Sequence, residues 1–235
     1  YEISACLVGS EMCIRDSNCG GDDYTDSFGQ LWLQDNTNYS RSWAENFKDL
    51  NPYLASQRTT NDPIRGTRDW TLFQHFRFGR HQLEYRFPVA DGTYRIELYF
   101  TEPWHGTGGS ASTDCEGLRI FDVAVNDSVV LDDLDIWAES GHDGVCKKVV
   151  YATVKGGVLK IHFPEVKAGQ GLISGIAIAS VDSNLQPTVF SASDWSWEKA
   201  GKEVMEKTPK ELLPEDKNAR VLSLIHISEP TRQAE

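Results

Sequence analysis

Residues 83–100, with the sequence LEYRFPVADGTYRIELYF, carry the clearest structural pattern in this chain. Apolar residues occupy every second position from Leu83 to Val89, and again from Tyr94 to Phe100. Alternation with a period of two is typical of a strand that buries one face. The segment ADG between the two runs supplies a glycine-containing turn. The pattern therefore predicts two strands joined as an antiparallel hairpin.

The same alternation recurs along the body of the chain. It is found over 121–125, which ends at the turn NDS, over 159–163, which follows the turn KGG, and at Ile176 and Ile178. Many short strands between turn signals predict an all-β fold with two packed antiparallel sheets. We expect the alternating apolar residues to fill its core, namely Tyr94, Ile96, Leu98, Phe121, Val123, Leu159 and Ile161.

The two ends of the chain do not share this pattern. A DNA sequence that encodes Cys6–Ser17 has a reverse complement that encodes Leu222–Gln233. Both ends therefore resemble the translated transposase-type adapter of a sequencing library, read from opposite strands. We expect residues 1–17 and 222–235 to be artefacts of that adapter, with irregular structure and poor packing. A chance strand pairing at Ile14 remains compatible with this interpretation.

Composition limits the remaining possibilities. One domain is expected over residues 18–189, since about two hundred residues remain between the two ends. Residues 190–221 are charged, contain Pro209 and Pro214, and predict a linker with a short helix in EKAGKEVMEK. The net charge of −12 argues against a nucleic-acid partner. No apolar run has the length of a membrane span.

Catalytic motifs are not found in the sequence: there is no phosphate loop, G-x-S-x-G or H-E-x-x-H. The acidic run Asp132–Asp135 offers oxygen ligands of the kind that bind calcium, although a solvated turn explains it equally well. Cys115 and Cys146 form either a disulfide, if the protein is exported, or two partly buried free thiols.

Aromatic residues are more informative. Trp104 lies in the segment FTEPWHGTGGS, directly after the predicted strand and beside Pro103 and a loop rich in glycine. A large ring in such a loop has little sheet to pack on. An exposed indole suits a ligand with an apolar face and polar edges, and a sugar ring is such a ligand.

A set of motifs, in order along the chain, points to a family. These are NCGG, DSFGQLWLQD, LFQHFRFG, GTYRIELYFTEPW, LRIFDVAVN, DLDI and GGVLKIHF. Together they resemble the malectin domain, also classed as family 57 of carbohydrate-binding modules. The resemblance implies a jelly-roll-like β-sandwich that binds glycans through loop aromatics at one end and has no catalytic residues or cofactor of its own.

The resemblance also implies a set of glycan-binding residues. The family's aromatic positions fall on Trp32, on Phe73 and Phe78 with Arg77 between them, and on Trp104 and His105 after Glu102. The family's late aspartate falls near Gln170, where this chain has no acid. Hydroxyl groups are lost at Phe73 and Phe78, so the preference for glucose that the family implies is not expected to transfer unchanged.

The segment WSWEKAGKEVMEKTPKELLPEDKNAR resembles the connector in bacterial glycoside hydrolases of the β-galactosidase type. That resemblance implies a secreted or periplasmic parent with a catalytic module in the same chain and an oligo- or polysaccharide as the partner. Two alternatives remain open. One is a non-binding spacer that positions a catalytic domain, and the other is a hydrolase that uses Glu102 with Asp114 or Glu116.

Overall fold

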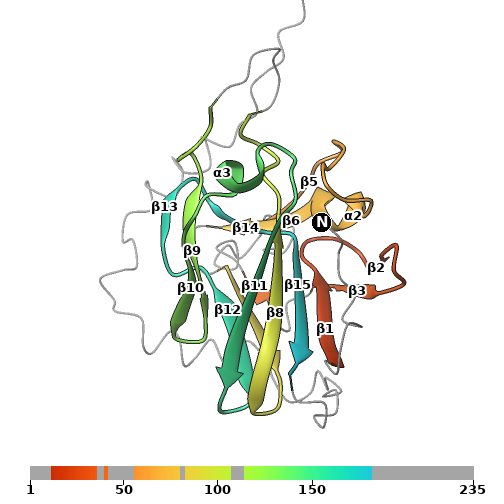
Figure 1. Ribbon diagram of the computed structural model, residues 1–235, viewed down its shortest axis with the longest axis vertical. Helices are drawn as coiled ribbons and strands as arrows, with labels where there is room; N and C mark the ends of the chain where they lie inside the picture. The colour runs from red at the N-terminus through yellow and green to blue at the C-terminus, as the bar shows by residue number, and fades with distance from the viewer. Residues whose placement is uncertain (1–11, 36–39, 42–55, 80–82, 107–113, 182–235) are drawn as a thin grey trace, which may run out of the picture. The chain divides into compact units, whose positions relative to one another are not determined.

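The computed structural model describes residues 12–35, 40–41, 56–79, 83–106 and 114–181. All of them lie in the first of two compact units, residues 1–191 (Figure 1). The predicted linker over 190–221, its short helix and the terminal segment 222–235 lie outside the described residues. Neither helix in the described part, α2 (Trp70–Gln74) nor α3 (Ile136–Ser140), has the length and apolar character needed to cross a membrane.

Six strands form the first sheet. Their spatial order is β11 (Cys146–Val154), β8 (Gly92–Phe100), β15 (Gly175–Ser180), β1 (Met12–Asn18), β3 (Leu31–Gln34) and β2 (Tyr24–Thr25). Neighbouring strands are antiparallel, except that β1 and β3 pair in parallel through Ser17 opposite Leu33 and Asn18 opposite Gln34.

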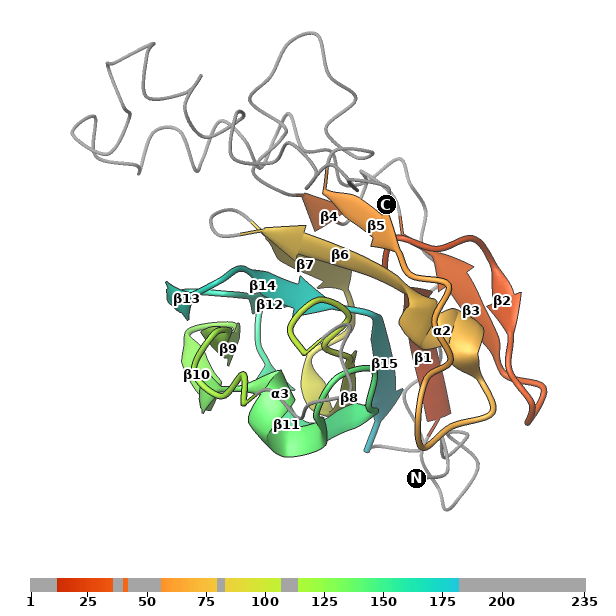
Figure 2. The ribbon, with the colours of Figure 1, turned by 90° about the horizontal axis from the view of Figure 1, so that it is seen from above.

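The second sheet lies in the other layer (Figure 2). Its order is β10 (Ser128–Leu134), β9 (Ile120–Val125), β12 (Val158–His162), β7 (Glu84–Pro88) and β4 (Ser40–Arg41), with β13 (Val166–Ala168) paired to β9. The expected all-β sandwich is therefore confirmed. The strand predicted over 121–125 is β9, and the turn NDS joins it to β10 in an antiparallel hairpin.

The predicted hairpin over Leu83–Phe100 is wrong in its pairing, although both strands form. Strand β7 pairs with β12 in the second sheet, whereas β8 pairs with β11 and β15 in the first. The turn ADG therefore crosses between the sheets, and the turn KGG crosses beside it, since Val89 N–H donates to the Gly157 carbonyl at 3.0 Å. Two strands with one apolar face each can pack face to face as readily as they can pair edge to edge.

Packing between the sheets explains that outcome. The core draws on both layers, with Tyr85 and Phe87 from β7 and Ile96, Leu98 and Phe100 from β8 all fully buried. Phe121 of β9 lies between Phe100 and Phe163, with ring centroids 6.1 and 5.5 Å away. Every residue that the sequence assigned to the core is fully buried, which confirms that assignment: Tyr94, Ile96, Leu98, Phe121, Val123, Leu159 and Ile161.

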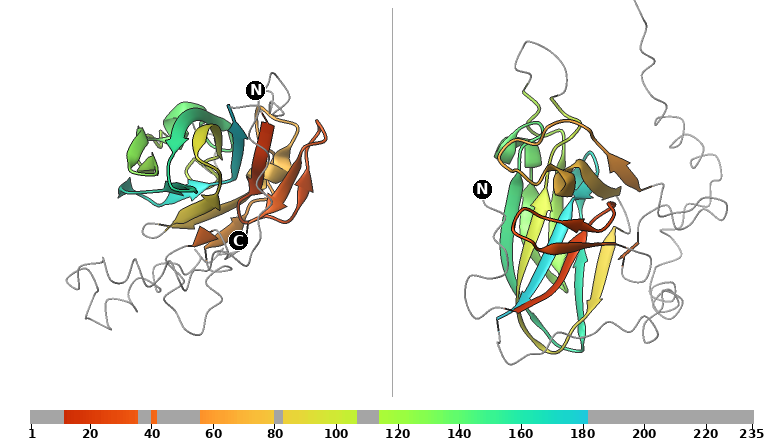
Figure 3. Two further views of the ribbon diagram at one scale, coloured as in Figure 1. Left: turned by 90° about the horizontal axis from the view of Figure 1, so that it is seen from below. Right: turned by 90° about the vertical axis from the view of Figure 1, so that its right-hand side faces the viewer.

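A third, smaller sheet and the two helices lie at one end of the sandwich (Figures 1 and 3). The sheet has the order β14 (Gly171–Ile173), β6 (His75–Gly79) and β5 (Gln57–Thr59). Helix α2 runs directly into β6, and α3 follows β10. The loop after β8 emerges at the same end.

The expectation of irregular structure over residues 1–17 is wrong for Met12–Ser17. These residues belong to β1, which pairs with β15 from Met12 opposite Ser180 to Asn18 opposite Gly175, with an irregularity between Cys13 and Arg15. Asp16 and Ser17 are buried. Ladder hydrogen bonds come from the backbone, so an open strand edge at β15 can pair with an extended segment whatever its sequence.

Candidate functional site

The carboxylate of Glu102 organises the loop after β8. Glu102 is fully buried two residues beyond Phe100. Its Oε1 atom accepts hydrogen bonds from the backbone N–H groups of Trp104 and His105, each at 3.0 Å. One buried anion thus fixes two successive backbone N–H groups and sets the direction of the loop that carries Trp104.

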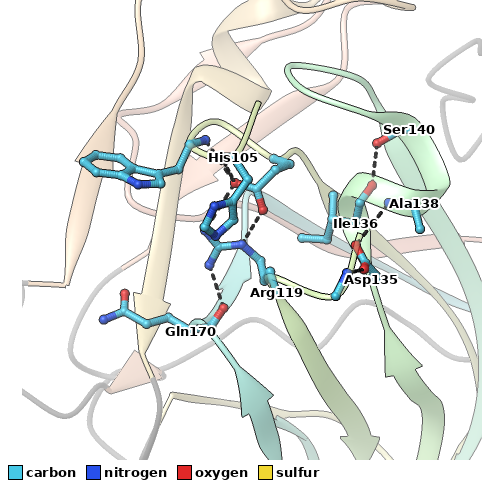
Figure 4. Close-up of polar contacts among 10 residues, drawn as sticks. His105, Arg119, Asp135, Ile136, Ala138, Ser140 and Gln170 are labelled. Carbon is cyan, nitrogen blue, oxygen red and sulfur yellow. Dashed lines mark hydrogen bonds and ion pairs between the residues drawn. The ribbon is translucent and has the colours of Figure 1, made fainter. Parts of the chain in front are cut away.

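Arg119, at the start of β9, neutralises this anion. Its Nε donates to Glu102 Oε2, and its Nη2 donates to Oε1 at 3.2 Å. The remaining nitrogen, Nη1, donates to the Gln170 carbonyl at 2.7 Å (Figure 4). The guanidinium therefore joins the loop after β8, the start of β9 and the connection between β13 and β14.

Electrostatics keep Glu102 ionised. Burial alone would raise its pKa. The hydrogen bond from Arg119, the positive charge of Arg119 and the two backbone N–H donors outweigh burial and lower the pKa below its ordinary value. A general acid for glycoside hydrolysis needs the opposite shift. Glu102 is also fully buried, and both of its carboxylate oxygens already accept hydrogen bonds, which disfavours the hydrolase alternative, in which Glu102 acts with Asp114 or Glu116.

The two residues on this loop differ in exposure. Trp104 exposes 67% of its surface, the largest fraction among the large hydrophobic residues of the described chain. His105 is half-buried, and burial lowers its pKa, only partly opposed by the negative charge of Glu102. A neutral imidazole at neutral pH can both donate and accept a hydrogen bond. Gln170 is also half-buried and is tied to this group through Arg119.

Trp32 and Phe73 do not join this group. Both are buried, at 1% and 0% exposure, in a second cluster of apolar side chains around Tyr99. The Trp32 ring meets the Tyr99 ring edge-on at 5.2 Å, and its Nε1 donates to Asp26 Oδ2 at 3.0 Å. The expectation that these two rings lie exposed for a sugar is therefore wrong. Both rings thus pack in the interior, in a buried cluster of residues from the first sheet and from α2.

Arg77 and Phe78 lie in β6 and belong to another network. Arg77, which is 1% exposed, donates from Nε and Nη2 to Asp35 at 2.7 and 2.8 Å. The Tyr85 hydroxyl donates to the same carboxylate at 2.7 Å. Phe78 is buried, with the Arg58 guanidinium 5.2 Å from its ring centroid. The structure thus brings together Glu102, Trp104, His105 and Gln170, and places the other four predicted residues in buried clusters.

Sequence reasoning missed Arg119, because a single arginine in the motif LRIFDVAVN gives no signal of a partner seventeen positions away. The need for a counter-ion becomes evident only once the structure shows that the Glu102 carboxylate is buried. Cys115 and Cys146 are buried free thiols, which agrees with the second of the two alternatives left open for them. Burial raises the pKa of the Cys146 thiol to about 11.

The residues of the acidic run over 132–135 have different surroundings. Asp135 caps α3, where its Oδ1 accepts from the Ala138 N–H at 3.0 Å. Asp132 and Asp133 lie with Asp122 such that carboxylate oxygens of all three are within 4.8 Å of one another. Lys167 already bonds to Asp133, so calcium binding by this run stays a prediction.

Comparison with known proteins gives the family. A family model described as the malectin domain matches residues 13–184. Malectin from Danio rerio is 26% identical over 154 residues, which cover 65% of this chain and 48% of that protein. Malectin from Mus musculus is 26% identical over 152 residues, covering 64% and 46%. The chain thus spans about half the length of the curated relatives it matches.

Solved structures share the fold. A Bacteroides uniformis β-glucuronidase aligns with a TM-score of 0.58 at 23% identity, covering 73% of this chain and 18% of that one. The ANX1 ectodomain from Arabidopsis thaliana aligns with a TM-score of 0.55 at 16% identity, covering 73% and 49%. At these identities the likeness concerns the fold alone. The family model covers most of the chain, and the chain therefore belongs to the malectin family, whose domains have a carbohydrate-binding, non-catalytic fold.

Proposed function

We propose that this chain is a glycan-binding domain that holds the apolar face of a sugar ring on the indole of Trp104. The observation that carries the proposal is the combination of a highly exposed tryptophan with a loop fixed by the buried pair of Glu102 and Arg119. An exposed ring on a fixed loop loses little conformational freedom when a ligand stacks on it.

Two residues near Trp104 can bind the sugar hydroxyl groups. His105 follows Trp104 directly, and Gln170 is joined to the same loop through Arg119. A hydroxyl group that exchanges water for such a partner gains only about 0.5–1.5 kcal/mol. With one stacking ring and few hydrogen bonds, we expect weak binding, with a dissociation constant on the order of 1 mM.

Weak binding is effective when a domain is tethered. A second domain in the same chain that acts on the same polymer gains a high effective concentration of substrate. We infer that this domain belongs to a longer bacterial glycoside hydrolase that is secreted or periplasmic. The resemblance of residues 190–221 to a hydrolase connector supports this, as does the likeness of the fold to part of a Bacteroides uniformis β-glucuronidase.

The test is a glycan array probed with the full chain, followed by Trp104→Ala. We expect retention of at least one class of glycan by the wild-type chain and loss of that retention in Trp104→Ala. Trp70→Ala is the matched control, since Trp70 is another exposed tryptophan, with 43% exposure, and it lies outside the proposed site. A wild-type chain that retains no glycan would favour a spacer, an alternative consistent with the burial of Trp32, Phe73 and Phe78.

A further inference from the structure

Three side chains with metal-ligating atoms meet next to the loop that carries Trp104. Asp62 lies before α2, and His142 and Asp143 follow α3. One ligand atom from each lies within 4.8 Å of the other two. The His142 Nε2 and the Asp143 Oδ2 are 2.9 Å apart. Two segments that are eighty positions apart in sequence thus bring one imidazole and two carboxylates together.

Two polar atoms of this group are buried without a hydrogen-bond partner in the described part of the chain. One is Asp143 Oδ1, on a residue that exposes only 6% of its surface, and the other is His142 Nδ1. Buried polar atoms in folded proteins are almost always satisfied, and each exception needs an explanation. A bound cation would supply the missing partner for a carboxylate oxygen.

The backbone holds these residues firmly in place. Asp143 N–H donates to the Glu102 carbonyl at 2.9 Å, and Arg65 N–H donates to the Asp143 carbonyl at 2.7 Å. The Arg65 side chain donates to the carbonyls of Ser140 and His142, at 3.0 and 2.6 Å. The Arg65 guanidinium hydrogen-bonds to carbonyl oxygens, and within the described part of the chain the Asp143 carboxylate forms its ion pair with His142.

Charge also favours a cation here. Asp143 is buried, and a carboxylate oxygen of Asp62 lies within 4.8 Å of its ligand atom, so two negative groups meet at one point. Two carboxylates held close together repel each other, and a bound cation relieves that repulsion. Asp62 is exposed, so an ion could reach the group from solvent.

We propose that Asp62, His142 and Asp143 bind a divalent transition-metal ion of the zinc type. Imidazole nitrogen with carboxylate oxygens is a donor set that suits zinc and its neighbours, whereas calcium prefers oxygen alone. Ligand atoms at about 2.1 Å from one ion lie at most about 4.2 Å apart, and the three ligand atoms here lie within 4.8 Å of one another. Water would complete the coordination.

The ion would connect two parts of the same end of the sandwich. It would join the segment before α2 to the segment after α3, which is bonded through Asp143 to the backbone of Glu102. A β-carbon placed on Gly106, on the loop that carries Trp104, would lie 3.2 Å from the β-carbon of His142. Metal binding would therefore stabilise the folded state at this end, whether or not the domain binds a glycan.

Titration calorimetry of the full chain with zinc chloride tests the proposal. We expect one equivalent bound by the wild type and an affinity reduced at least tenfold in Asp143→Asn. Asparagine tolerates the left-handed backbone that Asp143 adopts, with φ of 51°. Asp133→Asn is the matched control, because Asp133 has φ of 52° and belongs to the other acidic cluster. This control should bind zinc as the wild type does.

A second readout separates metal loss from misfolding. Zinc should raise the midpoint of thermal unfolding of the wild type and Asp133→Asn but not of Asp143→Asn. If Asp143→Asn fails to fold, Asp62→Asn, at an exposed position, replaces it with the same expectation. The proposal would be overturned by equal zinc affinity in all variants or by no binding to the wild type. It would also be overturned if cobalt, bound in place of zinc, gave a thiolate charge-transfer band, because that band would show ligation by cysteine.

Discussion

Arg119 and Glu102 form a buried two-point ion pair that joins the start of β9 to the loop after β8. Neither side chain exposes more than 8% of its surface. The Glu102 carboxylate also receives the two backbone N–H groups of Trp104 and His105. The backbone that carries the exposed indole of Trp104 is thus fixed by a buried charge pair.

Replacement of Arg119 should destabilise the protein strongly. Arg119→Met leaves the Glu102 carboxylate buried without a counter-charge, which should lower the free energy of unfolding by about 3–5 kcal/mol. Urea unfolding followed by circular dichroism measures this. Lys148→Met is the control, since the pair of Lys148 with Glu139 is partly exposed, and its loss should cost less than about 1 kcal/mol. A similar small cost for both variants would show that the pair does not hold the loop.

The same pair predicts a dependence of stability on acid pH. The folded-state pKa of Glu102 lies below its ordinary value of 4.5, so folding favours the ionised form. Its contribution to stability is fully present above the ordinary value and is lost as the pH falls through the folded-state pKa. Urea unfolding between pH 6 and pH 3 should therefore show a steeper loss for the wild type than for Glu102→Gln. Parallel curves would contradict the assignment of Glu102 as an ionised, paired carboxylate.

Trp32 should behave as a core residue. Trp32→Ala removes a ring that packs on Tyr99 and a donor to Asp26, and should lower the free energy of unfolding by about 3–5 kcal/mol. Thermal and urea unfolding measure this directly. Stability close to that of the wild type, together with lost glycan binding, would instead restore Trp32 to the binding surface that the family resemblance implied.

Strand β1 should protect its backbone amides. Residues from Asp16 to Asn18 pair with β15 on one side and, in part, with β3 on the other. Amide hydrogen exchange followed by mass spectrometry should therefore show slow exchange over this segment, comparable with that of β15. Complete exchange within seconds would agree with the adapter interpretation of residues 1–17 and would remove β1 from the sheet.

The sequence predicts the strands better than it predicts how they pair. Alternation in Leu83–Phe100 correctly marks β7 and β8, because one apolar face is needed wherever a strand borders a core. The pattern is the same whether the partner lies beside the strand or across the core. The assignment of β7 and β8 to different sheets depends on contacts with β12, β11 and β15, which lie far away in sequence.

The sequence likewise predicts the aromatic residues of the candidate site but not which of them are buried by contacts with distant residues. Trp104 could be identified because proline and glycine residues flank it and no strand follows directly. Trp32 and Phe73 are aromatic residues that the sequence does not distinguish from Trp104. Only the structure shows that both pack on Tyr99 and are buried. Arg119 pairs with Glu102 at a distance of 17 positions, and Asp35 pairs with Arg77 at 42, and a single sequence contains no record of such pairs.

A glycan that stacks on Trp104 should change the indole N–H signal of that residue in a nitrogen-labelled sample. The chain has seven tryptophans, and each indole signal can be assigned by single substitution. When a glycan retained on the array is titrated, the Trp104 signal should move in a saturable manner while the Trp32 signal stays in place. A Trp104 signal that stays in place while that of Trp70 or another tryptophan moves would contradict the account.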